Sequence, residues 1–111
     1  MAKDVVIYAR LSVEREESTS IDRQIEACSQ LADARSWTVT EECSDIGVSG
    51  AAELSNRAGL SRALAIVEAG EASVLVVYKM DRLARTVRGA YDIVERLDAV
   101  NCSLAVDTKS R

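Results

Sequence analysis

The stretch Asp4-Val-Val-Ile-Tyr-Ala9 decides the fold of this chain. It is a β-branched run with charge on both sides, which is the pattern of a strand buried on both faces of a sheet. A similar run, Val74-Leu-Val-Val-Tyr78, predicts another buried strand over residues 73–79. Doubly buried strands are typical of parallel sheets that carry helices on both faces. We therefore expect an α/β protein with a mainly parallel central sheet.

Apolar residues recur at steps of three and four in three segments, which predicts three helices. The first begins at Thr19 or Ser20, within a Ser/Thr cluster that can supply its N-cap, and ends near residue 35. The second covers residues 59–69, and Gly70 follows where a left-handed glycine is favoured. The expected buried stripes are Ile21, Ile25, Cys28 and Leu31, then Leu60, Ala63, Leu64 and Val67, then Val87, Tyr91, Val94 and Leu97.

Two further segments complete the predicted order of elements. Residues 37–43 alternate in a β-rich pattern, which predicts a second strand at an edge of the sheet, and residues 102–107 predict a fourth strand. Strands that alternate with helices imply right-handed crossovers and one sheet with helices on both faces. A long loop with Gly47 and Gly50 follows the second strand, and loops of this length usually carry function.

The composition limits the possible functions. The chain has 111 residues, which fit one domain, and no histidine, which excludes Ser-His-Asp triads and histidine metal sites. The three cysteines Cys28, Cys43 and Cys102 have no C-x-x-C spacing, so we expect small buried side chains in a reducing cytoplasm. No apolar run is long enough to span a membrane, and the formal net charge of −4 does not by itself indicate nucleic acid.

Polar residues gather directly after three of the predicted strands. In open parallel sheets ligands bind at the carboxyl ends of the strands, so these residues should meet in space. Ser12 is the only hydroxyl of the first cluster that could act as a nucleophile, and its alternation with Tyr8 and Arg10 points all three to one side. The later clusters contain Asp45, Lys79, Asp81, Arg82 and Arg85.

Residues 79–88 form a basic patch within an acidic chain. Four basic residues and one aspartate give it a local net charge of +3. We expect Arg82, Arg85 and Arg88 to share one face at the start of a helix. Cations at a helix N-terminus oppose the helix dipole, so this arrangement costs stability unless an anion binds there. Guanidinium groups suit a phosphoryl centre, which a serine could attack without a histidine. The alternative is a solvated helix face that pairs with nearby acids.

Several other residues allow two interpretations. Asp45 and Asp81 could hold arginines in place or bind a divalent metal for nuclease chemistry. Gln24 could reach the first strand from the first helix, or it could be an ordinary exposed glutamine. Arg57 precedes the second helix and allows the same two interpretations. Neither a G-x-G-x-x-G nor a P-loop motif occurs, so we expect no nucleotide cofactor.

Five motifs in order and spacing resemble the catalytic domain of serine site-specific recombinases, the resolvase, invertase and large serine integrase group. These are Tyr8-Ala-Arg10-Leu-Ser12, Ser20-Ile-Asp-Arg-Gln24, Asp45-Ile-Gly-Val-Ser-Gly50, Arg57-Ala-Gly-Leu60 and Asp81-Arg-Leu-Ala-Arg85. The long stretch 13–19 favours a phage-type integrase over a small resolvase. One departure is Ala58, where the family often has proline, and it leaves Arg57 intact.

The resemblance implies phosphoryl transfer on double-stranded DNA without metal or ATP. Ser12 would attack a scissile phosphate and form a 5′-phosphoserine link. Arginines that surround the phosphate in the family match Arg10, Arg82 and Arg85, and residues that organise the site match Asp81 and Gln24. The surrounding, substrate-binding positions match Tyr8, Asp45, Ser49, Arg57 and Lys79.

The resemblance also implies partners and further domains. Family members act as tetramers on two paired DNA sites, and they read sequence with domains that follow the catalytic one. We therefore expect residues 1–111 to be a catalytic domain truncated at its C-terminal end, which binds DNA weakly and does not recombine sites alone. Two alternatives stay open: a catalytically silent regulatory or scaffold domain, and a divalent-metal nuclease that uses Asp45 and Asp81.

Overall fold

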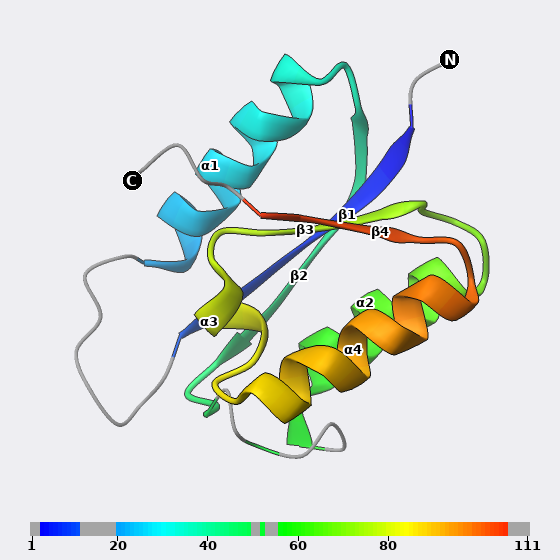
Figure 1. Cartoon of the computed structure of the whole chain (residues 1–111). Coiled ribbons are helices and arrows are strands. Elements are labelled where there is room, and N and C mark those ends of the chain that lie inside the picture. Colours follow the sequence, from blue (N-terminus) through cyan, green and yellow to red (C-terminus); the bar gives the residue numbers. More distant parts are fainter. Residues whose placement is uncertain (1–2, 12–19, 50–51, 53–55, 107–111) are drawn as a thin grey trace.

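A parallel sheet forms the centre of the molecule (Figure 1). The computed structural model describes residues 3–11, 20–49, 52 and 56–106. Within them, the strands pair in parallel in the order β2-β1-β3-β4. Their bounds are β1 Asp4–Leu11, β2 Thr38–Ile46, β3 Val74–Val77 and β4 Ser103–Val106. The predicted α/β class is confirmed, and so is the edge position of the second strand.

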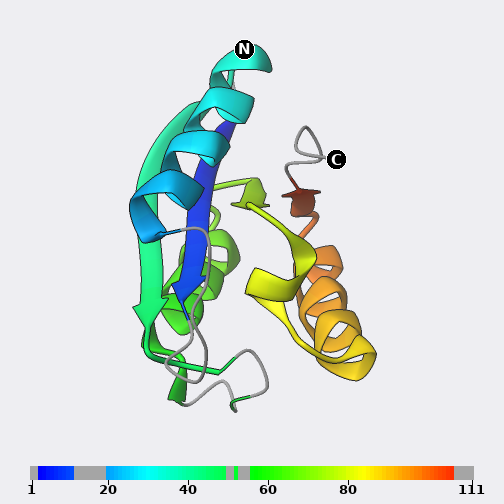
Figure 2. The same ribbon diagram turned by 90° about the vertical axis from the view of Figure 1, so that its left-hand side faces the viewer.

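Helices cover both faces of this sheet (Figure 1 and Figure 2). The long helices are α1 Ile21–Ala34, α2 Ala58–Glu68 and α4 Val87–Ala99, and the single turn α3 is Met80–Leu83. Helix α1 lies on one face, whereas α2 and α4 lie side by side on the other. Period-two alternation in β1 produces these layers, because Val5 and Ile7 pack toward α1 while Val6 and Tyr8 pack toward α2 and α4.

The helix ends follow the local sequence signals. The Ser20 hydroxyl oxygen caps α1 by accepting from the Arg23 backbone N–H at 3.2 Å, and Thr86 caps α4 by accepting from Gly89 at 3.0 Å. Gly70 has a φ of 80° just past α2, as its position predicted. All three cysteines are buried, as expected. No helix in the described ranges is both long and apolar enough to cross a membrane.

The strand boundaries differ from the prediction. Strand β1 continues to Leu11, beyond the predicted Ala9. Strand β2 extends to Ile46, beyond the predicted 37–43, because its polar residues continue the ladder to Leu11 of β1. Strand β3 is shorter than the predicted 73–79 and ends at Val77. In α1 the most buried positions are Gln24, Cys28 and Ala32. Of the expected stripe only Cys28 is among them, and Ile21, Ile25 and Leu31 are half-buried.

The predicted buried stripe of α4 is wrong at its start. Val87 is 88% exposed and Tyr91 is 63% exposed, whereas the buried residues are Ile93 and Leu97. The apolar arc of α4 is wider than the surface that the sheet and α2 cover. Periodicity alone therefore located the helix correctly. It placed the buried face on the side of Val87 and Tyr91, whereas the side of Ile93 and Leu97 is buried.

Candidate active site

Arg10 joins the carboxyl ends of three segments. Its side chain is buried, with 1% of the residue exposed. The Nε donates to the carbonyl of Arg82 at 3.2 Å, Nη1 to the carbonyl of Val48 at 2.8 Å, and Nη2 to the carbonyl of Asp81 at 2.8 Å. Strand β1, the loop after β2 and the turn α3 therefore meet at one guanidinium group, where the sequence predicted that strand ends would converge.

Gln24 holds the backbone of Arg10 from α1. Its Oε1 accepts from the Arg10 N–H at 3.2 Å, and its Nε2 donates to the Arg10 carbonyl at 3.0 Å. Strand β3 ends opposite Tyr8, so its backbone does not extend to Arg10. The side-chain amide takes the place of a neighbouring peptide there. Gln24 is fully buried, so the interpretation as an ordinary exposed glutamine is wrong.

Asp45 ties the end of β2 to β1 and to the start of α2. Its Oδ2 accepts from the Tyr8 hydroxyl at 2.7 Å and from the Leu60 N–H at 3.1 Å, and its Oδ1 accepts from the Gly59 N–H at 2.7 Å. A carboxylate at a helix N-terminus satisfies N–H groups that have no partner within the helix, and it also complements the helix dipole. The structure therefore gives Asp45 a positioning task.

Gly59 makes this approach possible, and the sequence analysis had assigned it no such role. A Cβ atom at Gly59 would overlap the backbone carbonyl of Ser44 and lie 3.1 Å from Cγ of Asp45. The absence of a side chain thus lets α2 begin directly against β2. A glycine in the first turn of a predicted helix, where alanine would serve the helix better, was the available signal.

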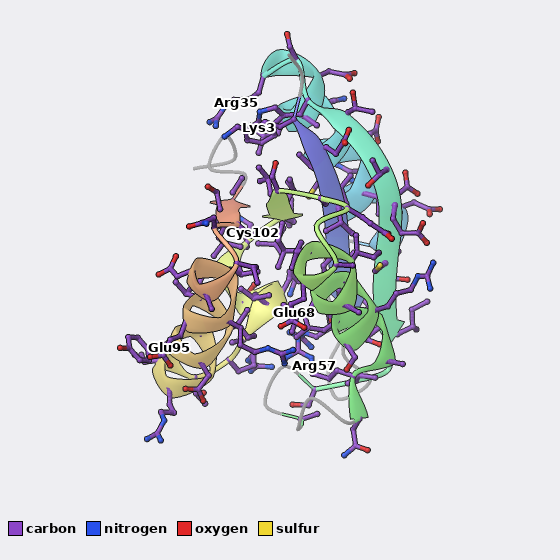
Figure 3. All side chains as sticks on the ribbon, turned by 90° about the vertical axis from the view of Figure 1, so that its right-hand side faces the viewer. Lys3, Arg35, Arg57, Glu68, Glu95 and Cys102 are labelled. Atoms are coloured by element: carbon purple, nitrogen blue, oxygen red, sulfur yellow. The ribbon has the colours of Figure 1, made fainter. Side chains whose placement is uncertain are left out.

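Arg57 lies in the same buried network, where α2 and α4 both begin (Figure 3). Its Nη2 donates to the Tyr8 hydroxyl oxygen at 3.1 Å and to the Arg82 carbonyl at 3.3 Å, and its guanidinium lies 5.5 Å from the centre of the Tyr8 ring. Burial raises the pKa of Tyr8 well above its usual range, which outweighs the opposing effect of Arg57. Tyr8 therefore remains a neutral donor to Asp45.

The arginines after β3 do not share one helix face as predicted. Helix α3 ends at Leu83, the backbone is extended at Ala84, and α4 begins only at Val87. Arg82 is buried and its Nη1 lies 3.6 Å from Oδ1 of Asp81, whereas Arg85 is exposed between the two helices. A spacing of three residues is also that of one continuous helix, so it could not predict the break between α3 and α4.

The remaining predicted site residues are placed as follows. Ser12 lies outside the described residues and follows Leu11, whose carbonyl accepts from the N–H groups of Gly47 at 2.6 Å and Val48 at 3.3 Å. Ser49 is half-buried in that loop. Lys79 lies with its Nζ 5.1 Å from the centre of the Tyr78 ring. In the part of the chain that is described, no group of three or more His, Cys, Asp and Glu side chains could hold a metal ion.

Comparisons with known proteins identify relatives over almost the whole chain. The family model described as "Resolvase, N terminal domain" matches residues 5–110. The N-terminal catalytic domain of TP901-1 integrase is 31% identical with a TM-score of 0.83, covering 97% of this chain and 79% of that chain. No curated protein matches.

Two further solved structures agree. The C-terminal catalytic domain of ISC1926 TnpA, an IS607-like serine recombinase, is 30% identical with a TM-score of 0.81, covering 93% of this chain and 68% of that chain. A serine recombinase from Sulfolobus solfataricus is 29% identical with a TM-score of 0.67, covering 97% of this chain and 69% of that chain. The family model and these structures cover the strand ends that Arg10 joins. This chain is therefore a member of the resolvase N-terminal domain family, the serine site-specific recombinases.

Proposed function

We propose that this chain cuts and rejoins double-stranded DNA in site-specific recombination of the integration and excision type, with Ser12 as the nucleophile. The proposal rests on family membership and on one observation above all. The guanidinium of Arg10, two residues before Ser12, donates to the backbone of Asp81 and Arg82. The arginines after β3 are thereby fastened beside the end of β1, where the nucleophile follows.

In the proposed reaction the Ser12 hydroxyl oxygen attacks a scissile phosphorus. A bond forms between the serine oxygen and phosphorus, and the bond from phosphorus to the 3′ oxygen breaks. The leaving 3′ oxygen takes up a proton, which leaves a 3′-hydroxyl and a 5′-phosphoserine link. After strand exchange the oxygen of a 3′-hydroxyl attacks the phosphorus of this link and restores the DNA backbone. The bond between phosphorus and the Ser12 oxygen breaks, and that oxygen takes up the proton that the 3′-hydroxyl loses. The phosphodiester energy is kept in the covalent link.

The proposed roles combine the family match with the contacts of each residue. Arg10, Arg82 and Arg85 stabilise the charge on the transferring phosphoryl group, because guanidinium forks match phosphate oxygens. Gln24 and Asp81 organise the site. The surrounding residues Tyr8, Asp45, Ser49, Arg57 and Lys79 position the phosphate-binding groups or contact the DNA. We propose no metal and no cofactor for this chemistry.

The assembly and cellular setting are part of the same proposal. Residues 1–111 act as one catalytic domain of a cytoplasmic protein, which assembles as a tetramer on two paired DNA sites. The formal net charge of −4 fits this division, because affinity for DNA is set mainly by cationic contacts to phosphates. Most of that affinity would then reside outside these residues.

A covalent-adduct experiment tests the proposal. The full-length protein is incubated with nicked suicide duplexes of random sequence, from which the cleaved strand end diffuses away, and the products are resolved on a denaturing gel. We expect a protein–DNA adduct that disappears in Ser12→Ala and persists in Ser103→Ala, a matched change at an exposed serine on β4. An undiminished adduct in Ser12→Ala refutes the proposed nucleophile.

The same experiment in EDTA separates this reaction from the divalent-metal nuclease. That alternative needs the Asp45 carboxylate as a ligand, yet both oxygens of Asp45 already accept hydrogen bonds from Tyr8, Gly59 and Leu60. We expect adduct formation to be unchanged by EDTA.

A further inference from the structure

Arg10 is covered by backbone in this structure. The role proposed for it requires a guanidinium that a phosphate can reach, yet only 1% of the residue is exposed. Backbone carbonyls accept from its Nε, Nη1 and Nη2 alike. A phosphate oxygen has to approach such a donor to about 2.7–2.9 Å, and a group this buried leaves no room for that approach. Part of its surroundings must therefore move before Arg10 can bind DNA.

Two of the three covering carbonyls belong to α3 and are firmly held. The carbonyls of Asp81 and Arg82 accept from Arg10 at 2.8 Å and 3.2 Å. The Arg82 carbonyl also accepts from Nη2 of Arg57 at 3.3 Å, within the buried network. Leu83, the last residue of α3, is fully buried in the core. Moving these carbonyls away from Arg10 would therefore disrupt the packing of the whole turn.

The third carbonyl belongs to the loop after β2 and can move more easily. The Val48 carbonyl accepts from Nη1 of Arg10 at 2.8 Å, and Val48 is only half-buried. The N–H groups of Gly47 and Val48 donate to the Leu11 carbonyl at 2.6 Å and 3.3 Å. Gly47 has a φ of 75°, a left-handed conformation that glycine adopts without strain. Rotation at Gly47 can thus lift Val48 while the end of β2 stays in the sheet.

A phosphate is the better partner for the Nη1 group that Val48 now occupies. Val48 offers one neutral oxygen, whereas a phosphate offers charged oxygens in the geometry of a guanidinium fork. Water can donate to the released Val48 carbonyl, because this residue lies at the surface of the loop. The exchange of acceptors therefore favours the phosphate once DNA is bound.

We propose that Gly47 and Val48 form a clasp over Arg10, which opens at Gly47 before a DNA phosphate binds that guanidinium. The bonds from Arg10 to Asp81 and Arg82 persist, so α3 keeps its place while the clasp opens. The inference rests on the proposed function, since it concerns how the phosphate reaches Arg10. Opening precedes cleavage, and the clasp thus restrains cutting until a phosphate competes for Arg10. By linkage, the bound phosphate in turn keeps the clasp open.

Gly47→Ala tests the clasp through the rate of the reaction. Alanine is strained at a φ of 75°, and opening releases this strain, so the open state should gain about fivefold in population. In the suicide-substrate assay of the full-length protein at saturating DNA, we expect adduct formation to become roughly fivefold faster. Gly70→Ala is the matched control, because Gly70 has a φ of 80° and lies past the end of α2. An unchanged or slower rate in Gly47→Ala overturns the clasp.

Hydrogen exchange at Val48 gives a second readout that does not depend on the chemistry. The Val48 N–H donates to the Leu11 carbonyl while the clasp is closed, so its protection reports the closed state. By NMR of the 111-residue chain, Gly47→Ala should exchange this proton about fivefold faster, after correction for intrinsic rates. The amide of Val76 in the buried strand β3 should not change, which excludes global unfolding as the cause. Unchanged exchange at Val48 contradicts the hinge at Gly47.

DNA itself should open the clasp. The full-length Ser12→Ala protein, which is expected to bind DNA without forming an adduct, is compared by hydrogen exchange with and without a short duplex of random sequence. Exchange at Val48 should become faster with the duplex, and slower or equal exchange overturns the proposal. The two proposals fail separately. Loss of the Ser12-dependent adduct in the natural protein refutes the proposed function, whereas a normal adduct with a clasp that never opens refutes only this inference.

Discussion

The side-chain amide of Gln24 forms a reciprocal pair of hydrogen bonds with the backbone N–H and carbonyl of Arg10, at 3.2 Å and 3.0 Å. This pair fixes the last residues of β1 beyond the end of β3, directly before the proposed nucleophile. Its energetic importance comes from burial, because an unsatisfied buried peptide group costs about 1–3 kcal/mol. The amide is thus both a structural element and a means of holding the nucleophile's strand.

Replacing Gln24 by alanine should lower the free energy of unfolding by about 2–4 kcal/mol, because two buried backbone groups lose their partners and a cavity forms. Urea denaturation measures the change. Gln30→Ala is the matched control, since Gln30 is exposed on the same helix and its loss should stay within about 0.5 kcal/mol. Equal stability of the two variants would contradict the bridging role of Gln24.

Much of the fold could be predicted because its signals are local. The β-branched runs of β1 and β3 and the apolar periods of α1 and α2 each lie within a short window. The burial of Gln24 could not be predicted in this way, because its partner Arg10 is fourteen residues away in the chain. Which side of α4 is exposed depends on how much of the helix its neighbours cover. A local sequence pattern holds no information about these neighbours.

The candidate site was predicted as a set of residues but not as a network. Convergence of the strand ends followed from the parallel topology, and it correctly brought Arg10 and Arg82 together. The hydrogen bonds from Tyr8 to Asp45 and from Asp45 to Gly59 could not be inferred, because they require the distance between β2 and α2. Gly59 sets that distance.

Substituting Gly59 by alanine should destabilise the chain by more than about 2 kcal/mol. The new methyl group would overlap the Ser44 carbonyl, which belongs to β2 and cannot move without breaking the ladder to β1. Thermal unfolding followed by circular dichroism measures the loss.

Gly70→Ala provides a comparison that separates space from backbone strain. Gly70 has a φ of 80° and no atom within 4 Å of the added Cβ, so alanine there costs only the left-handed conformation, about 1 kcal/mol. A loss at Gly59 that is no larger than the loss at Gly70 would show that α2 can shift away from β2.

The buried hydroxyl of Tyr8 should make stability depend on alkaline pH. Burial raises the pKa of Tyr8 in the folded chain, whereas in the unfolded chain it keeps its ordinary value of about 10. The contribution is constant below that ordinary value. Above it the unfolded state loses the proton first, so folded stability falls by up to about 1.4 kcal/mol per pH unit.

Comparison with Tyr8→Phe isolates this effect from the lysines and cysteines that titrate in the same range. The variant should be less stable than the natural chain near pH 8, because Asp45 and Arg57 lose a partner, but its stability should fall less steeply above pH 10. Tyr91→Phe, at an exposed tyrosine, should keep the steep dependence. Parallel curves for Tyr8→Phe and the natural chain would show that Tyr8 ionises as freely when folded.

Substitutions of the two arginines on either side of Ala84 should affect the free energy of unfolding and the rate of adduct formation differently. Arg85 is exposed, so Arg85→Ala should leave the free energy of unfolding within about 0.5 kcal/mol and yet slow adduct formation about 10²–10³-fold, the cost of losing one group that stabilises transition-state charge. Arg82 is buried and lies close to Asp81, so Arg82→Ala should lower both the free energy of unfolding and the rate of adduct formation. Arg35→Ala is the control, because Figure 3 shows Arg35 at the opposite end of the molecule from Arg57. Arg35→Ala also removes one positive charge. Equal slowing of adduct formation by Arg35→Ala and Arg85→Ala would therefore mean that Arg85 only contributes to the general attraction of DNA. Slowing by Arg85→Ala alone assigns its guanidinium to the phosphate.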